Sequence, residues 1–319
     1  MLYRGSKYYT DSEGLRQTLD KYGIAIIPNL FSPKECNKIL SDMWDYFEYI
    51  TQKWDVPIDR NDNNTWKEIY KLYPLHSMLI QYFGIGQAQF AWNVRENPKI
   101  IEVYENLFNT TELLVSFDGS SFSVPPEITK RGWFRSAKFH TDQSYCRNEF
   151  ECAQSWITAL DVEEGDATLA VLEGSNLFHA EFARVFSKNN KVDWYKLNDS
   201  EIKWYINKGC REIRIKCPKG SAVFWDSRTI HCGVEPEKNR LNPKIRAIVY
   251  TCYMPREYIT NANLKKKIKA FNDLRTTNHW PVYPKLFPKH PRTYGGPEVI
   301  ITPYPKPTLT ERGLKLAGF

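Results

Sequence analysis

From about residue 112 the chain consists largely of short β-prone runs that are separated by turn residues. Runs of this length and spacing predict strands, and a long series of them predicts an antiparallel sandwich or barrel. The runs cover 113–119, 136–142, 154–162, 168–175, 211–218, 221–233 and 245–254. The stretch Glu163–Asp166 reads as a hairpin turn within this series.

The part before residue 112 reads differently, because apolar residues there recur at helical spacing. Ser32 and Pro33 provide an N-cap and a first-turn proline, and Asn97 and Pro98 do the same for a later helix. We expect helices over 10–22, 32–49, 75–85 and 96–108, and a buried strand over 23–30. A helical insertion over 176–208, a helix over 260–274 and a Pro-rich tail complete the prediction.

Two histidines and an aspartate fall at the ends of predicted strands. His140 and Asp142 are two residues apart, so on a strand their side chains point to the same face. His231 ends a later predicted strand. Two imidazoles and one carboxylate are the protein ligands of non-haem Fe(II) oxygenases. An isolated His-x-Asp arises easily by chance, and a partly buried, hydrogen-bonded histidine at a strand end is its ordinary structural explanation.

Composition limits the class of protein. Hydrophobic residues make up 42% and aromatic residues 14% of the 319 residues, which predicts a well-packed core. No apolar run has the length of a membrane span, and no apolar signal segment opens the chain. Seven cysteines without a Cys-x-x-Cys pair favour a reducing compartment. We therefore expect a soluble, cytoplasmic protein.

The net charge is +7, and part of the excess lies in Lys265, Lys266, Lys267 and Lys269. A solvated helix face explains such a run, and an anionic substrate explains it equally well. No nucleic-acid-binding module is visible, so nucleic acid is not expected as a partner.

The order of several segments resembles one family. LDKYGIAIIPNLFSPKEC precedes His140-Thr141-Asp142, SWITALDVEEGDATLAVLEGSNLFH follows it, and KGSAVFWDSRTIHCG leads to Arg246. Over about 15–255 this order resembles the phytanoyl-CoA dioxygenase-like branch of the Fe(II)/2-oxoglutarate-dependent oxygenases. The resemblance implies a mainly β fold with a helical N-terminal segment and a double-stranded β-helix (jelly-roll, cupin-like) core. It implies one oxygenase domain over 1–319, with the N-terminal part over 1–111, the core over 112–256 and the tail over 257–319.

The resemblance also implies roles for individual residues. His140, Asp142 and His231 would bind Fe(II), and Arg246 would pair with the far carboxylate of the cosubstrate 2-oxoglutarate. Arg240 is a rival for that role, although it lies in a predicted loop. The bidentate guanidinium suits a carboxylate better than a lysine does. Ascorbate is expected as a stimulant of turnover.

Three departures from the family pattern concern the surroundings of these residues. The family's Pro-Gly-Ser-His-like turn reads Glu173 to Asn176 here, Gly233 stands where a cosubstrate-binding hydroxyl is common, and the spacing from His231 to Arg246 is long. The retained Asp142 argues against halogenation, which needs that ligand position open.

Further pocket residues are predicted from their positions. Trp156 and Thr158 lie on one face of a predicted strand and are assigned to the cosubstrate pocket, although core packing explains Trp156 as well. The substrate candidates flank the predicted site, and a structural role is an equal alternative for each. They are Trp133, Lys138, Gln143, Tyr145, Arg95 and Asp118.

The predicted function is Fe(II)- and 2-oxoglutarate-dependent hydroxylation of a C–H bond in a small molecule or acyl-type substrate, with dioxygen consumed and succinate and carbon dioxide released. Demethylation or another oxidation is open to the same chemistry. The alternative is a non-catalytic jelly-roll protein whose basic C-terminal part binds a phosphate-bearing or nucleic-acid partner. The sequence predicts neither the substrate nor the oligomeric state.

Overall fold

Two β-sheets pack face to face at the centre of the computed structural model, which describes residues 2–72, 78–130, 138–189, 191–238, 240, 242–293 and 295–319. The smaller sheet has the order β1 (Tyr3–Arg4), β10 (Arg211–Ile215), β8 (Thr168–Glu173), β12 (His231–Val234), β6 (His140–Thr141) and β9 (Tyr195–Lys196). Among its described strands the β1–β10 pair is parallel and the other pairs are antiparallel.

The larger sheet is antiparallel and contains the longest strand. Its order is β2 (Ile24–Ile27), β11 (Ala222–Asp226), β7 (Ala153–Thr158), β13 (Arg246–Pro255), β5 (Ser120–Ser123) and β3 (Leu79–Ile80). A further short strand, β4 (Leu113–Val115), pairs with the far end of β13.

Side chains alternate between the two faces of the larger sheet, as the pleat requires. Trp156, Val223 and Ile248 point inward and pack against Leu169 and Val171 of the smaller sheet. The opposite face carries Ile157, Phe224 and Val249, among others, and joins the largest apolar cluster together with the helices. The near-continuous apolar runs of β7, β11 and β13 follow from this burial on both faces.

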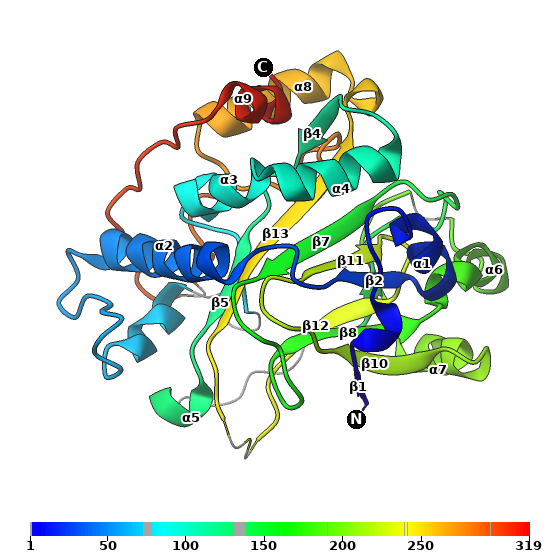
Figure 1. The fold of residues 1–319 in the computed structure, drawn as a ribbon, viewed down its shortest axis with the longest axis horizontal. Coiled ribbons are helices and arrows are strands. Elements are labelled where there is room, and N and C mark those ends of the chain that lie inside the picture. The colour runs from blue at the N-terminus through cyan, green and yellow to red at the C-terminus, as the bar shows by residue number, and fades with distance from the viewer. Residues whose placement is uncertain are drawn as a thin grey trace.

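Helices cover the outer face of the larger sheet. In Figure 1, α2 (Pro33–Thr51), α3 (Gln89–Arg95) and α4 (Pro98–Phe108) lie across β13 and β7, with α8 (Asn261–Asn272) and α9 (Glu311–Ala317) beyond them. The helices α6 (His179–Val185) and α7 (Asp199–Asn207) lie at the edge of the smaller sheet, near α1 (Leu15–Tyr22), and the one-turn helix α5 (Pro126–Thr129) follows β5.

The predicted helix caps of α2 and α4 are confirmed. Ser32 forms a capping box with Glu35 at the start of α2, and the Asn97 side chain accepts from the Lys99 N–H at the start of α4. The helical insertion is confirmed as α6 and α7, with the short strand β9 between them.

Several expected elements are wrong in extent or type. The predicted helix over 75–85 is wrong over its described part, 78–85, which contains β3 and a turn at Gly84 with φ of +71°. The predicted strand 221–233 is two strands, because residues 227–230 turn the chain from the larger to the smaller sheet. The β5 strand was not predicted, because its serines lack an apolar pattern.

Two more corrections concern one connection between strands and the relative content of helix and strand. Glu163–Asp166 forms a turn but not a hairpin, since β7 and β8 belong to different sheets. The fold is not mainly β, because the described helices contain more residues than the described strands.

The lysine run on α8 is not a uniform solvated face. Lys267 is 1% exposed and donates to the Val115 carbonyl, while Lys265 and Lys266 remain at the surface. No helix in the described part of the chain combines the length and the apolar character needed to cross a membrane.

Candidate metal centre

Three side chains from the smaller sheet and the loop after it converge at one point. His140 on β6 is directly paired with His231 on β12, and their ring centroids are 4.5 Å apart. Asp142 follows β6, with its Oδ2 3.2 Å from His231 Nε2 and its Oδ1 3.8 Å from His140 Nε2. One potential ligand atom of each residue lies within 4.8 Å of the others, which suits a single metal ion.

Backbone carbonyls fix the orientation of both imidazoles. His140 Nδ1 lies 2.8 Å from the Lys138 carbonyl, and His231 Nδ1 lies 2.9 Å from the Thr229 carbonyl. Because a carbonyl oxygen only accepts, each Nδ1 carries the proton and each Nε2 of a neutral ring keeps its lone pair. Both lone pairs are therefore free for a metal.

The protonation states also suit metal binding. Burial and the neighbouring His231 lower the pKa of His140 to about 4, so its ring is neutral at physiological pH. Burial acts to raise the pKa of the Asp142 carboxyl, but the imidazoles of His279 and His231 outweigh it and hold that pKa well below its usual range. Gln154 Nε2 donates to Asp142 Oδ2 at 2.8 Å and orients the carboxylate. A neutral imidazole, as at His140, and an ionised carboxylate are forms that bind metals.

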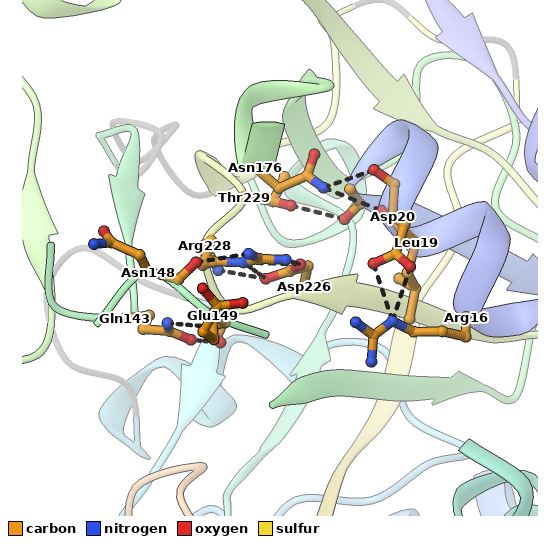
Figure 2. Close-up of polar contacts among 12 residues, drawn as sticks. Arg16, Leu19, Asp20, Gln143, Asn148, Glu149, Asn176, Asp226, Arg228 and Thr229 are labelled. Carbon is orange, nitrogen blue, oxygen red and sulfur yellow. Dashed lines mark hydrogen bonds and ion pairs between the residues drawn. The ribbon is translucent and has the colours of Figure 1, made fainter. Parts of the chain in front are cut away.

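The turn that carries His231 is anchored to neighbouring elements, as Figure 2 shows. Thr229 Oγ1 donates to the Gly23 carbonyl at 2.8 Å, directly after α1. Arg228 forms an ion pair with Asp226 at 2.6 Å and donates to the Asn148 carbonyl at 2.8 Å. These contacts hold the Thr229 carbonyl, and through it the imidazole of His231, in place.

Arg246 lies on the inner face of the larger sheet and is 7% exposed. Its Nε donates to Ser121 Oγ at 3.0 Å and its Nη1 to the Ala167 carbonyl at 2.8 Å, while the guanidinium lies 5.7 Å from the Trp156 ring. No acidic side chain among the described residues pairs with Arg246, and the buried Trp156 Nε1 has no partner there either. A positive charge without a counter-ion, beside an unpaired N–H donor, fits a carboxylate ligand.

Arg240 has no such capacity. Its Nε lies 2.8 Å from Glu127 Oε1 and its Nη1 2.8 Å from Asp166 Oδ1, so two carboxylates already neutralise it. The structure therefore leaves Arg246 as the better candidate of the two.

Gly233 lies two residues after His231 on the same face of β12. A Cβ added there would meet only Met78 Cε, at 4.0 Å. The position has room for a small side chain, and this chain supplies no hydroxyl there.

Several predicted pocket residues are engaged with the protein itself. Gln143 donates to the Arg147 and Glu149 carbonyls and accepts from Ser227 Oγ, so its amide holds loops together. Thr158 Oγ1 donates to the Leu160 carbonyl at the end of β7. The polar atoms of Gln143 and Thr158 are therefore bonded to the protein, and these side chains shape the site rather than bind a ligand.

Tyr145 belongs to the packed core beside α6. Its ring stacks on His179 and Phe182, and its hydroxyl lies 3.2 Å from the hydroxyl of Tyr205. This environment favours the structural alternative for Tyr145.

The remaining predicted substrate residues fall into different environments. Arg95 is fully buried and donates to the Gly86 and Asp118 carbonyls, so it joins two loops. The Asp118 carboxyl is buried, and burial with the nearby charge of Asp142 raises its pKa to about 7. The Lys138 side chain is exposed, and Trp133 lies outside the described residues.

Sequence reasoning missed Gln154, Ser121, Trp194 and His279. Gln154 could have been found from strand alternation, since it shares a face with Trp156 on a predicted strand. Ser121 could not, because its strand β5 was not predicted. Trp194 lies in the helical insertion, with its ring 5.9 Å from that of His140. No local pattern marks Trp194 or His279.

Comparisons with known proteins identify a matching family and similar relatives. The family model described as phytanoyl-CoA dioxygenase matches residues 19–235. "Ava biosynthesis cluster protein O" of Aspergillus versicolor is 23% identical over 276 residues, covering 83% of this chain and 85% of that protein. A "putative phytanoyl-CoA dioxygenase" of Dictyostelium discoideum is 24% identical over 273 residues, covering 72% of each.

Solved structures are similar at lower identity. The non-heme alpha ketoglutarate dependent carbocyclase SnoK from nogalamycin biosynthesis has a TM-score of 0.49 and 16% identity, over 77% of this chain and 86% of that one. The epimerase SnoN, in complex with Fe3+ and alpha ketoglutarate, has a TM-score of 0.47 and 12% identity, over 76% of this chain and 83% of that one.

Proposed function

The chain belongs to the phytanoyl-CoA dioxygenase family, and from this membership we propose that it oxidises a small molecule at the site formed by His140, Asp142 and His231. As a member of this family it is an Fe(II)- and 2-oxoglutarate-dependent oxygenase. The observation that carries the proposal is the convergence of two imidazole Nε2 atoms and one carboxylate, with no other protein ligand among the described residues. Three protein ligands leave positions free for a cosubstrate and dioxygen.

We propose a double-stranded β-helix, or jelly-roll, as the core of this oxygenase, within a single domain over 1–319. Two facing sheets, antiparallel except for the β1–β10 pair, support this architecture. The helices of the N-terminal part close the outer face of the larger sheet and belong to the same apolar cluster.

The cosubstrate end of the site is assigned to Arg246, Ser121 and Trp156. The Arg246 guanidinium would pair with the far carboxylate of 2-oxoglutarate, and its bonds to Ser121 and Ala167 keep the fork oriented. Trp156 offers its unpaired Nε1–H and an apolar wall at the same place.

Iron and 2-oxoglutarate, when bound, supply the reductive activation of dioxygen, with succinate and carbon dioxide as co-products. The protein positions the target C–H bond and keeps water from the reacting atoms. The outcome proposed for the substrate is hydroxylation, because Asp142 is present as a ligand. Demethylation or another oxidation would use the same residues.

The substrate proposed is a small molecule, and the similarity to a biosynthesis cluster protein supports this choice. Asp118 is retained as a candidate substrate contact, because its buried carboxyl lies within the electrostatic influence of Asp142. Gln143 and Tyr145 are assigned to positioning rather than contact, because protein partners occupy their polar atoms.

The test is substrate-dependent succinate formation across a library of small molecules and acyl-CoA esters, with Fe(II), 2-oxoglutarate and ascorbate present. At least one compound should stimulate turnover in the wild type, and His140→Ala and Asp142→Ala should abolish that stimulation. His290→Ala is the matched control, because this histidine is half exposed and is not a member of the metal cluster. Equal turnover in both ligand variants would contradict the site. Salt-sensitive nucleic-acid binding without any turnover would favour the non-catalytic alternative.

A further inference from the structure

A loop in the C-terminal part of the chain, residues 277–286, is closed by hydrogen bonds. Thr277 N–H donates to the Phe117 carbonyl at 2.9 Å, and Asn278 N–H donates to the Lys285 carbonyl at 3.0 Å. The Asn278 side chain closes the loop, since it donates to the Tyr283 carbonyl and accepts from Lys285 N–H. The loop lies after residue 235, so it is outside the region that the family model matches.

This loop packs beside the metal centre. Trp280 is 1% exposed and lies in one apolar cluster with Cys152, which directly precedes β7, and Cys252 of β13. Two residues after Cys152 on the same strand is Gln154, whose amide orients Asp142. His279, the residue before Trp280, therefore lies next to the metal-binding residues.

His279 lies close enough to influence all three members of the cluster. Its imidazole contributes to the lowered pKa values of His140 and Asp142, and His231 in turn acts on the pKa of His279. Its ring lies 5.2 Å from that of Trp280. His279 Nε2 is buried and has no hydrogen-bond partner among the described residues.

An exposed tryptophan lies near the same point from another direction. Trp194 is 58% exposed, adopts a left-handed backbone with φ of +68°, and has its ring 5.9 Å from that of His140. A bulky residue in this conformation is strained, and such strain concentrates at functional sites.

One arginine connects Trp194 to the C-terminal loop. Arg147 Nη2 lies 2.7 Å from Asp193, the residue before Trp194, and its guanidinium lies 5.1 Å from the Trp280 ring. The insertion and the loop are therefore joined beside the metal centre, and each contributes an aromatic side chain there.

We propose that His279 is a substrate-recognition residue, and that its Nε2 forms a hydrogen bond with a hydroxyl or carbonyl oxygen on an otherwise apolar substrate held near Trp194. The proposal rests on the proposed function, because it assigns the substrate side of the same centre. A buried polar atom without a partner is costly, so a ligand that pairs with it is preferred over one of the same shape that cannot. The aromatic neighbours suit an apolar ring as the body of that ligand.

Matched pairs of small probes test this directly. Methylenecyclohexane carries a CH2 group in place of the carbonyl oxygen of cyclohexanone, and methylcyclohexane carries a methyl group in place of the hydroxyl of cyclohexanol. Each probe is titrated anaerobically into the protein loaded with Fe(II) and 2-oxoglutarate, and the change in the visible charge-transfer band is followed. In the wild type, the oxygen-bearing member of at least one pair should act at roughly tenfold lower concentration than its apolar partner.

Two substitutions of His279 and one control at His290 separate recognition from folding. His279→Leu should remove the preference for oxygen, whereas His279→Gln, which keeps a polar group at a similar distance, should retain most of it. His290→Leu, a change at an exposed histidine in the same part of the chain, should leave the preference intact. The band of the complex without probe should remain in all three variants, and its absence from the wild type would instead refute the proposed function.

The proposal is overturned if the wild type shows no preference within either pair, including the case in which no probe perturbs the band. It is also overturned if His279→Leu keeps the wild-type preference. Thermal melting of the three loaded variants confirms that each is folded during the titration.

Discussion

Two groups of residues at the metal centre, here called the floor and the mouth, differ in whether their polar atoms have partners in the protein. The floor, formed by His140, Asp142 and His231, has every atom that faces the protein paired: each Nδ1 meets a carbonyl, and Asp142 Oδ2 meets an amide. The mouth, formed by Asp118, Trp194 and His279, contains a buried carboxyl of raised pKa, a strained backbone and an unpaired imidazole nitrogen.

This difference suits two separate tasks, cofactor binding at the floor and substrate recognition at the mouth. The floor lies entirely within residues 19–235, the region shared with the family, whereas His279 lies beyond it. A fully supported set of ligands suits the binding of a metal cofactor. An unpaired nitrogen on a segment outside that region, His279 Nε2, suits recognition of the substrate.

The largest expected effect is at the floor. Asp142→Ala removes the only carboxylate ligand of the cluster, so the purified protein should retain little iron and form no succinate above background. Metal analysis after gel filtration measures the first effect and succinate assay the second. Asp118→Ala, at the mouth, should keep the iron. Equal iron content in Asp142→Ala and the wild type would contradict the distinction between floor and mouth.

The next effect concerns the cosubstrate. Arg246→Met should raise the KM for 2-oxoglutarate by roughly 10- to 100-fold, because it removes a charge-assisted pair, while iron binding is retained. Initial rates at varied 2-oxoglutarate and a separate iron titration test this. Arg240→Met is the comparison, because its guanidinium is already paired with two protein carboxylates. A larger rise in KM for Arg240→Met would reverse the assignment.

A smaller effect is expected where the floor is supported rather than formed. Gln154→Leu leaves all three ligands in place but removes the amide that orients Asp142, so iron affinity should fall by roughly tenfold. Competition with a fluorescent chelator measures it. Unchanged affinity would mean that Asp142 needs no such support.

At the mouth, Asp118→Asn should raise the stability of the protein in a pH-dependent manner. The pKa of Asp118 is raised from 3.8 to about 7 by burial, so ionisation destabilises the folded state increasingly as pH rises from about 4 to 7. The variant should exceed the wild type by on the order of 1 kcal/mol at pH 8, and the gain should vanish near pH 4. Urea denaturation at the two pH values measures this. An equal difference in the free energy of unfolding at both pH values would show that ionisation of Asp118 is not responsible.

The smallest effect is expected at Gly233. Gly233→Ser places a hydroxyl where a Cβ meets only Met78 at 4.0 Å, so the variant should fold and bind iron as the wild type does. A modest decrease in the KM for 2-oxoglutarate, about two- to threefold, would follow from one added hydrogen bond. Thermal melting and initial rates test both parts, and a loss of several degrees would show that the space is not available.

The sequence was informative wherever local pattern and spacing decide the structure. The helix caps at Ser32 and Asn97 and the buried strands β7, β8 and β13 follow from local chemistry and were predicted. The strand β5 and the helix α3 were not, because tertiary packing rather than propensity stabilises them. The connection through Glu163–Asp166 was mistaken for a hairpin, because local sequence does not tell which sheet a strand joins.

For the site, the predictable part was the set of residues whose chemistry is tied to spacing. His140, Asp142 and His231 were predicted from the alternation of strand side chains and from the order of segments, and they lie together. His279 and Trp194 lie near this cluster only through long-range packing, so no spacing rule could identify them. Gln143 and Tyr145 were proposed from proximity in sequence alone, and the structure gives their polar atoms protein partners.

The most direct test of the central claim is the visible absorption of the protein during anaerobic addition of Fe(II) and then 2-oxoglutarate. The account predicts a charge-transfer band that appears only when both are present, persists in His279→Leu, and is absent from Asp142→Ala. A band of equal intensity in Asp142→Ala and His140→Ala, or no band in the wild type at saturating concentrations, would contradict the assignment of the floor as the iron site.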